Sequence, residues 1–432
     1  MKASSTKAHS PTCSWILLAA LLYGALLCWP YVKELPTLGT VQAQRVWDPI
    51  TRRNVWNDYD NSFLILLFGV VGILLLLLFL IQCWKMFRRT YRAKHRQPIP
   101  DPSFSRYLHQ DFHRTLLFLP TLGVVLVLII PLAVMILIGF TNYDRAHLVP
   151  TNLFTWVGLE NFRQLTALGS SSAFAYAFPR VLGWTMVWAV TATLSCYIGG
   201  VLLAMLINHQ RTVAKPFWRT CFMIAMAVPQ FVSLLLVRNF FADVGIVNTL
   251  MKQWGVTDWL YSMGAIPTAN YIPFLTHPDW ARPMILLINL WVGVPYQLLI
   301  ATGILINIPR ELTEAARIDG AGGWTIFRYI TLPYLLSITA PSLVSGIVGN
   351  INNFNVIWLL SRDVYVTTDQ LLAQAGATEV DLLVTWLYRL TQDQSNYKMA
   401  SVIGLLVFAV CSALTLTAFG HLTREGSEAT FR

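Results

Sequence analysis

Long apolar segments separated by shorter polar ones make up most of the sequence. Eight of them have about the 17–25 residues that a helix needs to cross the hydrocarbon of a bilayer. A helix satisfies its own backbone hydrogen bonds within lipid, so the pattern predicts an all-α, polytopic membrane protein. The segments are residues 15–31, 62–84, 115–139, 180–207, 217–237, 284–306, 334–360 and 399–420.

A polar, glycine-bearing stretch at 311–333 separates the sixth apolar segment from the seventh. Pro309 suits the first position of a helix, and Gly320 can end that helix in a left-handed conformation. A second short helix is expected from Trp324, with Pro333 ending it. The stretch must lie outside the hydrocarbon, where charges and unpaired backbone groups are costly. A small helix pair at a membrane face indicates a docking element for another protein.

The composition agrees with a membrane protein. Of the 432 residues, 55% are hydrophobic and 12% are charged, which excludes an ordinary soluble domain. The formal charge of +10 comes from basic residues beside apolar segments, a pattern of membrane topology rather than of nucleic-acid binding. The six cysteines show no CxxC spacing, so neither a disulfide framework nor a metal site is expected. The lipid bilayer is therefore an expected partner, and nucleic acid is not.

The loop charges orient the apolar segments. Residues 85–114 are rich in Lys and Arg, whereas residues 32–61 are balanced, so 85–114 is expected in the cytoplasm. The basic run at its start is interpreted as a topology determinant that touches anionic lipid; a specific regulatory contact is the alternative. Alternation then gives the cytoplasmic segments 208–216, 307–333 and the tail from 421, and the external segments 140–179, 238–283 and 361–398.

Two features stay open at this point. The first apolar segment follows Lys2 and Lys7, and it can be an uncleaved anchor or a cleaved secretory signal. Either one exports residues 32–61, so the topology does not decide between them. The external segments are rich in Trp, Tyr and Asn, which suits the membrane interface and a docking surface for an external partner equally well.

The apolar segments hold almost no charge, and their polar residues are mostly amides. Asn350 and Asn353 of GIVGNINNFNVIW are three apart and are expected to share one helix face. Amides both donate and accept hydrogen bonds, as a neutral, hydroxyl-rich ligand such as a sugar requires. Hydrogen bonding between packed helices is the alternative. Ion-coupled transporters usually keep charged groups in the membrane, so the neutral set argues against that class.

Two further apolar segments combine proline with polar residues. In LWVGVPYQLL, Gly293 and Pro295 can bend or open the helix beside Tyr296. In AVPQF, Pro229 removes a backbone donor next to Gln230. Broken helices that line a cavity recur in transporters, and a tolerated proline kink is the alternative.

Motifs that convert chemical energy are absent from the sequence. It has no GxxxxGK(S/T) phosphate loop, no HExxH and no GxSxG, so no catalytic residue is expected. Any ATP hydrolysis must then occur on another chain. An ion-coupled secondary transporter of a neutral polar solute would take up solute without ATP. A non-transporting sensor or scaffold would leave uptake intact when this chain is removed.

A series of motifs follows in order along residues 115–420. The polar stretch holds Glu314, Ala315, Ala316, Asp319, Gly320, Ala321, Ile330, Leu332 and Pro333. The others are FTNYD at 140–144, VGLENF at 157–162, AVPQF at 227–231, WVGVPYQ at 291–297 and NNFNVIWLL at 352–360. Together they resemble the permease subunits of binding-protein-dependent ABC importers, in their sugar branch, and the polar stretch resembles the EAA loop. The two N-terminal segments resemble the MalF-type subunit of maltose/maltodextrin importers.

The resemblance implies an ABC importer type I permease core of six helices, with two N-terminal helices added. Residues 1–114 would be the N-terminal extension with its basic cytoplasmic linker. Residues 115–420 would be the permease core, with the coupling loop at 309–333, and residues 421–432 a cytoplasmic tail. The protein would lie in the inner membrane of a bacterium, with its C-terminus in the cytoplasm.

The resemblance also implies partners. The EAA loop would dock on a cytoplasmic ATPase dimer that carries the ATP and Mg, so this chain would bind no cofactor or metal. A second, homologous permease subunit would complete the channel. An extracytoplasmic sugar-binding protein would deliver maltose, maltodextrin or a related oligosaccharide. The ATPase-coupling residues would be Glu314, Ala315, Ala316, Asp319, Gly320 and Ala321.

The sugar contacts of the maltose-type member match Gly293 and Tyr296 in the sixth apolar segment and Asn350 and Asn353 in the seventh. Gln230 of the fifth segment completes the expected substrate site.

The sequence departs from the family at four positions near these contacts. Met226, Gln230, Gly346 and Gly349 stand where the family has Tyr, Ser, Ser and an aromatic residue, which leaves the sugar or its pose open. The segment 140–179 is also shorter than the folded domain that some maltose-type members carry there. Contact with the binding protein must then be simpler, or use other loops.

Overall fold

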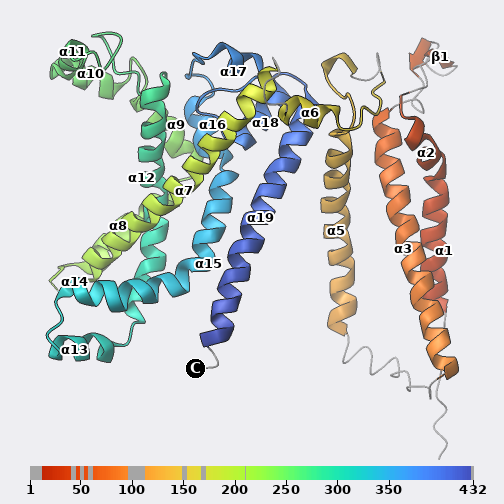
Figure 1. The fold of residues 1–432 in the computed structure, drawn as a ribbon, viewed down its shortest axis with the longest axis horizontal. Helices are drawn as coiled ribbons and strands as arrows, with labels where there is room; N and C mark the ends of the chain where they lie inside the picture. Colours follow the sequence, from red (N-terminus) through yellow and green to blue (C-terminus); the bar gives the residue numbers. More distant parts are fainter. Residues whose placement is uncertain are drawn as a thin grey trace, which may run out of the picture. The chain divides into compact units, whose positions relative to one another are not determined.

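The computed structural model describes residues 12–39, 45–48, 53–56, 62–95, 112–147, 153–166, 172–209 and 211–429. Helices dominate these residues, so the all-α class is confirmed (Figure 1). A small antiparallel hairpin, which the sequence did not predict, joins strands β1 (Arg45–Asp48) and β2 (Arg53–Trp56). The predictions for Lys2, Lys7 and the linker residues 96–111 lie outside the described residues.

Each predicted apolar segment corresponds to one helix or to a pair of helices. Five described helices are long and apolar enough to cross a membrane, or up to seven if each strongly bent pair is one span. The part of α5 over Val127–Ile138 is apolar but shorter than these spans. The elements are α1 (Thr12–Leu27) with α2 (Trp29–Glu34), α3 (Ser62–His95), α5 (Phe112–Ile138), α7 (Ala173–Asn208), α8 (Lys215–Ala227) with α9 (Gln230–Phe240), α12 (Pro278–Ile306), α15 (Leu332–Ile351) with α16 (Phe354–Ser361), and α19 (Tyr397–Ala429).

Short elements connect these helices. They are η1 (Leu35–Thr37), η3 (Arg145–His147), α6 (Glu160–Thr166), α10 (Ile246–Gln253), α11 (Val256–Ser262), α13 (Arg310–Ile318), α14 (Gly323–Ile326), η4 (Phe327–Thr331), α17 (Gln370–Gln374) and α18 (Leu383–Gln392).

The chain packs as two compact units. The first comprises Met1–Phe162 with Ser395–Val402, and the second comprises Arg163–Gln394 with Ile403–Arg432. The packing thus divides the chain at a different place from the boundary at 114 that the motifs indicate. That boundary concerns function rather than packing, and it stays a prediction.

The first unit has a core that joins α3 to α5 and to the segment after α5. Its buried residues are Leu38, Ile65, Leu66, Val70, Val134, Ile138 and Phe154. Polar contacts hold the same segment: Trp156 Nε1 donates to the Leu35 carbonyl at 2.8 Å, and Lys398 Nζ lies 2.6 Å from Asp144 Oδ2. Burial raises the pKa of Asp144, but hydrogen bonds from Lys398 and His147 outweigh it, so the pKa is lowered overall.

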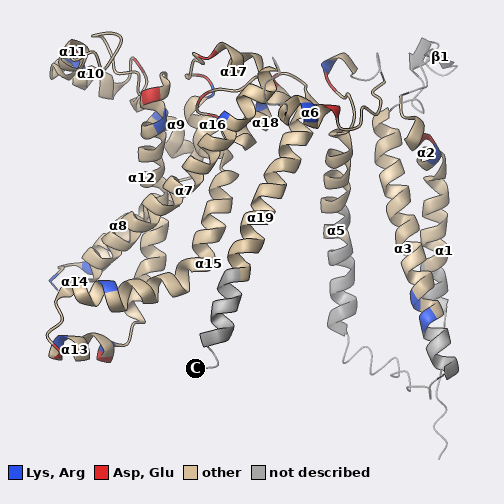
Figure 2. Ribbon diagram, in the orientation of Figure 1, with Lys and Arg blue, Asp and Glu red and all other residues tan. Residues whose placement is uncertain are grey.

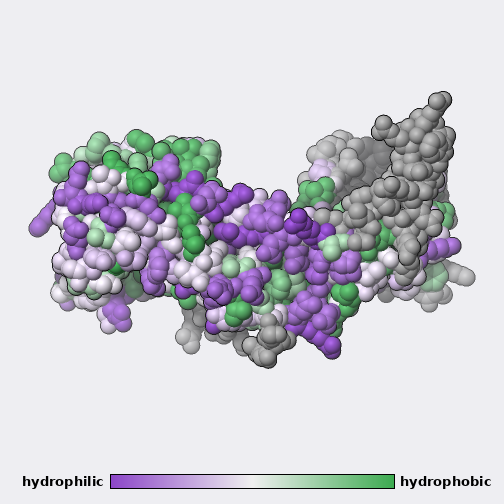
Figure 3. Space-filling view, turned by 90° about the horizontal axis from the view of Figure 1, so that it is seen from above, coloured by the Kyte–Doolittle hydropathy of each residue, from purple (hydrophilic) through white to green (hydrophobic). Residues whose placement is uncertain are grey.

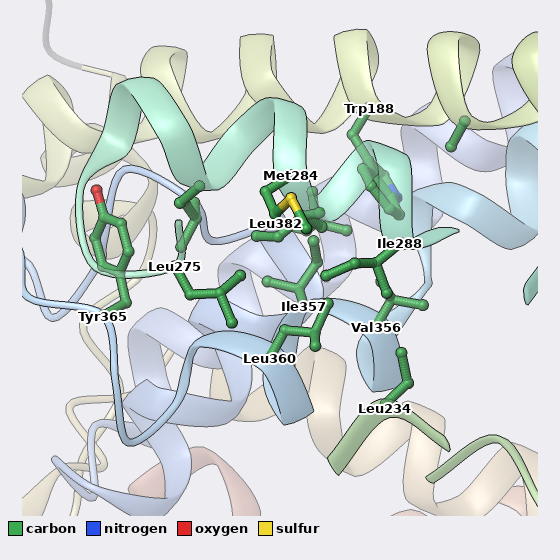
Figure 4. Close-up of a cluster of buried hydrophobic side chains, with 14 of the residues drawn as sticks. Trp188, Leu234, Leu275, Met284, Ile288, Val356, Ile357, Leu360, Tyr365 and Leu382 are labelled. Atoms are coloured by element: carbon green, nitrogen blue, oxygen red, sulfur yellow. The ribbon is translucent and has the colours of Figure 1, made fainter. Parts of the chain in front are cut away.

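Helix α7 is the central helix of the second unit and packs along α12 and α15. Gly200 permits a close approach, because a Cβ on it would lie 2.5 Å from Gln297 Cβ of α12. A buried cluster that includes Trp188 joins α7 to α9, α12 and α16 (Figure 4). A second cluster, which includes Tyr197 and Leu335, joins α7 to α12 and α15.

The second unit has two polar ends and an apolar middle. Its charged residues gather at the helix ends and in the connections (Figure 2). Helices α10, α11, α17 and α18 lie at one end, and α13 lies at the opposite end (Figure 1). Seen from the α10–α11 end, hydrophobic residues lie among hydrophilic ones over the part that holds these helices (Figure 3). This arrangement is that of a bundle embedded in lipid at its middle.

Candidate functional site

The predicted docking element begins with α13. The C-terminal end of this helix has the glycine conformation that the sequence predicted. Pro309 precedes the helix as its N-cap, one position earlier than expected. Gly320 has the predicted left-handed conformation, with φ of +81°. Gly320 N–H donates to the Arg317 carbonyl at 3.0 Å, and Ala321 N–H donates to the Ala316 carbonyl at 2.9 Å. These two bonds form a Schellman motif, which satisfies the last carbonyls of the helix.

The helix that follows does not end at Pro333, so this prediction was wrong. Helices α14, η4 and α15 follow one another without a gap (Figure 1). The η4 segment is π-helical, and Leu332 N–H donates to the Phe327 carbonyl. A π-helical turn leaves one backbone carbonyl without a partner in the helix and widens the helix locally. The ring of Pro333 is therefore accommodated, and its lack of an N–H does not break the helix.

The part of the chain that the structure describes leaves most of the surface of α13 uncovered. No residue of the helix is buried, and Ile318 is 86% exposed. Glu314, Ala315 and Asp319, which the resemblance predicts to be coupling residues, are exposed as well. Apolar side chains, small residues and a rigid helix end form a surface that another protein can cover.

The seventh apolar segment is broken at its asparagines. Helix α15 ends at Ile351, and Asn353 is the N-cap of α16. The predicted common helix face of Asn350 and Asn353 is therefore wrong, because the chain leaves the helix between them. The two side chains nevertheless meet, with Asn353 Nδ2 donating to Asn350 Oδ1 at 3.2 Å. Asn353 Oδ1 also accepts Val356 N–H at 3.3 Å and so caps α16.

Helix α7 supplies partners for these amides that the sequence reasoning missed. Asn350 Nδ2 donates to Thr193 Oγ1 at 2.9 Å, and Trp188 Nε1 donates to the Asn350 carbonyl at 3.1 Å. The only sequence signal was a hydroxyl within an apolar helix. Interhelical hydrogen bonding, the alternative explanation of the asparagines, is thus part of the structure. The NH2 groups of Asn350 and Asn353 carry two hydrogens each. Within the described residues, each group donates one of its two hydrogens.

The sixth segment is not opened as the sequence suggested. Helix α12 runs through Gly293 and Pro295 without a break. A Cβ on Gly293 would lie 2.5 Å from Cys196 Sγ, so this glycine permits close packing between α12 and α7. Tyr296 is 56% exposed. No hydrogen bond among the described residues joins Gly293 or Tyr296 to the asparagines.

The fifth segment is broken as predicted, with a 90° bend between α8 and α9. Gln230 is the first residue of α9, which runs beside α16. Leu234 packs in the same cluster as Val356 (Figure 4), and Arg238 Nη1 donates to the Leu359 carbonyl at 3.4 Å. These two contacts show that α9 and α16 run in the same direction. Gln230 lies one helical turn before Leu234, so it is level with the residues one turn before Val356, at the break between α15 and α16.

The departures at Gly346 and Gly349 differ in their surroundings. A Cβ on Gly346 would lie 3.2 Å from Thr193 Cγ2, whereas a Cβ on Gly349 would meet nothing within 4 Å. The space beside the break is therefore open at Gly349. Across the described residues, no three His, Cys, Asp or Glu side chains are placed to hold a metal ion.

Comparison with known proteins assigns the family. Residues 197–425 match the family model described as the binding-protein-dependent transport system inner membrane component. The match includes α13 and both asparagines. The chain belongs to this family. It is therefore a multi-pass inner membrane component of a transport system, as the pattern of apolar helices also indicates.

Relatives of this inner membrane component cover nearly the whole chain. The maltodextrin transport system permease protein MalC of Streptococcus pneumoniae is 30% identical over 416 residues, which cover 94% of this chain and 89% of that protein. The galactooligosaccharides transport system permease protein GanP of Bacillus subtilis is 31% identical over 364 residues, 82% of each chain. A bacterial ABC transporter involved in the import of alginate has the same fold, with a TM-score of 0.54 at 21% identity, covering 73% of this chain and 97% of that chain.

Proposed function

We propose that this chain is the transmembrane permease subunit of an ATP-driven importer of oligosaccharides. Its partners would be a cytoplasmic ATPase dimer, a second homologous permease subunit and an extracytoplasmic sugar-binding protein. The observation that carries the proposal is α13: a helix without a buried residue and with a glycine-capped end, at the end of its unit opposite α17 (Figure 1). Such a helix can transmit movement from an ATPase because the Schellman motif holds its last turn.

The break between α15 and α16 would form the sugar site. Among the residues that the structure describes, Asn350 and Asn353 each keep one amide hydrogen for a ligand, and Gln230 lies level with the break. Gly349 leaves open space at the same place. Neutral amides suit a neutral sugar, because they replace its hydrogen bonds to water without burying a charge. Gly293 would act through packing of α12 rather than by direct contact, and Tyr296 would contribute from an exposed position.

The names of the relatives support an oligosaccharide as substrate. MalC is a maltodextrin permease and GanP a galactooligosaccharide permease. Maltodextrin and related oligosaccharides are therefore the substrates to test first. In this proposal α13 and the C-terminus face the cytoplasm, and the ATP and Mg are bound by the ATPase chains.

Reconstitution would test this function. The chain is co-purified with its partners, placed in proteoliposomes, and supplied with binding protein loaded with maltodextrin, galactooligosaccharide or no sugar. We expect sugar-loaded binding protein to stimulate ATP hydrolysis and ATP-dependent uptake. Uptake that proceeds without ATP but stops when the ion gradient is collapsed would instead establish an ion-coupled transporter. Normal uptake without this chain would establish a sensor or scaffold.

A further inference from the structure

A cavity of about 500 Å³ lies where α7, α12 and α17 meet, at the end of the second unit opposite α13. Four charged side chains line it, together with apolar residues of α7. The charged residues are Arg180, Arg282, Asp369 and Glu379. We infer that this cavity binds the phosphate group of a membrane phospholipid, whose acyl chains lie along α7.

The carboxylates of the cavity are already occupied by hydrogen bonds. Asp369 Oδ2 accepts Tyr176 O–H at 2.7 Å, and Asp369 Oδ1 accepts two backbone N–H groups at the start of α17. Glu379 Oε1 accepts three donors around Thr368, and Glu379 Oε2 accepts Tyr365 O–H at 3.0 Å. These bonds keep both carboxylates ionised and leave them little capacity for a ligand.

The guanidinium groups are held in place but keep free donors. Arg282 uses Nε and Nη2 on the Glu379 carbonyl, at 3.0 and 2.6 Å, and lies 4.7 Å from the ring of Trp184. Arg180 uses Nη1 on the Tyr176 carbonyl at 3.1 Å and stacks on the ring of Tyr176. Within the described residues, Arg282 Nη1 donates to no acceptor, and Arg180 is held only by the carbonyl, ring and hydroxyl of Tyr176. A cavity with free N–H donors and occupied acceptors favours an anionic oxygen ligand such as phosphate.

The outer face of α7 explains why that phosphate would belong to a lipid. An exposed apolar stripe, spaced at three or four residues, runs down the helix from the cavity wall. It consists of Val187, Val190, Leu194, Ile198, Leu202 and Leu206. Arg180 and Gly183 continue the same spacing upward, and Val187 lines the cavity itself. The cavity therefore lies at the upper end of this apolar stripe and supplies polar groups there.

The dimensions fit a bilayer. From Val187 to Leu206 the stripe is about 28 Å long at about 1.5 Å per residue, close to the hydrocarbon thickness of about 30 Å. Arg180 lies about 10 Å beyond its upper end, at the level of the lipid headgroups. Helix α7 crosses α12 at an angle (Figure 1), so both lengths are upper limits along the membrane normal. The leaflet involved is the one on the side opposite α13.

Photolabelling in lipid nanodiscs would test the site on the full chain with its co-purified partners. The probes are phosphatidylglycerol and diacylglycerol, each carrying a photoreactive group in one acyl chain, and labelled peptides are mapped by mass spectrometry. We expect phosphatidylglycerol to label residues 183–194 of α7 at least about fivefold more than diacylglycerol does, because only the former carries the phosphate. Equal labelling by both probes would refute a phosphate site.

Variants test the donors separately. Arg180→Gln should lower phosphatidylglycerol labelling about fivefold, and Arg180→Lys should retain most of it. Arg362→Gln is the matched control, since Arg362 also stacks on an aromatic ring, Trp358, but does not line the cavity. Unchanged labelling in Arg180→Gln, or loss of labelling when sugar-binding protein is added, would overturn the inference. The latter result would assign the cavity to a protein partner.

Discussion

Asn353 has two separable tasks at the break between α15 and α16. Its Oδ1 accepts the Val356 N–H and caps α16, whereas its Nδ2 donates to Asn350. We expect Asn353→Ser to keep the cap, because a serine oxygen serves at an N-cap, and to lose the amide donor. Sugar uptake should then fall about three- to tenfold with little change in the thermal midpoint of unfolding.

Asn353→Ala provides the comparison, because it removes the cap as well. That loss should cost about 1 kcal/mol of stability in addition to the lost uptake. Uptake assays and thermal unfolding of the purified protein measure the two effects. If uptake and folded yield fall in parallel in Asn353→Ser, the amide serves packing and not the sugar.

Asp144 links the segment after α5 to the start of α19. It accepts Lys398 Nζ at 2.6 Å, His147 Nδ1 at 2.8 Å and Ala146 N–H at 3.0 Å. Its pKa is lowered below the value of about 3.9 for an unfolded chain, so its stabilisation is present above that pH and lost as pH falls through the lower folded value. We expect Asp144→Asn to destabilise the protein by about 2 kcal/mol at pH 7 and by progressively less below about pH 4.

Thermal unfolding at pH 7, 5 and 3 measures this difference. Asp363→Asn is the control, because the Arg238–Asp363 pair is mostly exposed on its carboxylate side and should contribute little. A gap between wild type and Asp144→Asn that widens as the pH falls would contradict the assignment.

Some single residues were predictable and others were not. Gly320 was, because a left-handed helix end depends on local backbone sterics that glycine alone relieves. The partners of Asn350 were not, because Thr193 and Trp188 are distant in sequence and nothing local marks them. The environments of Tyr296 and Gly293 were not predictable either. Tyr296 is exposed and Gly293 packs on Cys196, because of the way α12 packs on α7.

At the scale of elements, proline had three different outcomes. The chain bends by 90° at Pro229, continues as one helix through Pro295, and absorbs Pro333 in a π-turn. A proline removes one N–H in every case, but the neighbouring helices decide whether the freed carbonyl is tolerated. The sequence therefore located the sites of weakness without deciding which of them break.

The end of α13 should be essential for coupling. Gly320→Ala places a Cβ in a left-handed conformation, which disfavours the Schellman motif and loosens the last turn. We expect membrane insertion to be normal and sugar-stimulated ATP hydrolysis to fall severalfold in the reconstituted complex. Gly322→Ala is the matched control, because Gly322 has φ of −73° and free space for a Cβ. Equal activities in the two variants would show that the glycine end does not matter for coupling.

At the scale of the whole molecule, the proposed topology puts α13 and the segment before α17 on opposite sides of the membrane. In a background without the six native cysteines, single cysteines are placed at Ile318 and Val366, both strongly exposed. A membrane-impermeant maleimide should label Val366→Cys in intact cells and Ile318→Cys only after the membrane is opened. Labelling of both in intact cells would refute the alternation derived from the loop charges.

The sequence by itself determined the class of this protein, the number of its apolar segments, the position of the polar helix α13 and the glycine end of that helix. Each of these depends on a sum over neighbouring residues: the free energy of placing a segment in lipid, or the local sterics of a turn.

The tertiary structure decided which helices break, which side chains meet Asn350, and that Arg180 and Arg282 share one cavity. Those outcomes need surfaces of α7, α12, α15 and α17 to meet. Hydrogen bonds and packing act between neighbours in space, which the order of residues alone does not reveal.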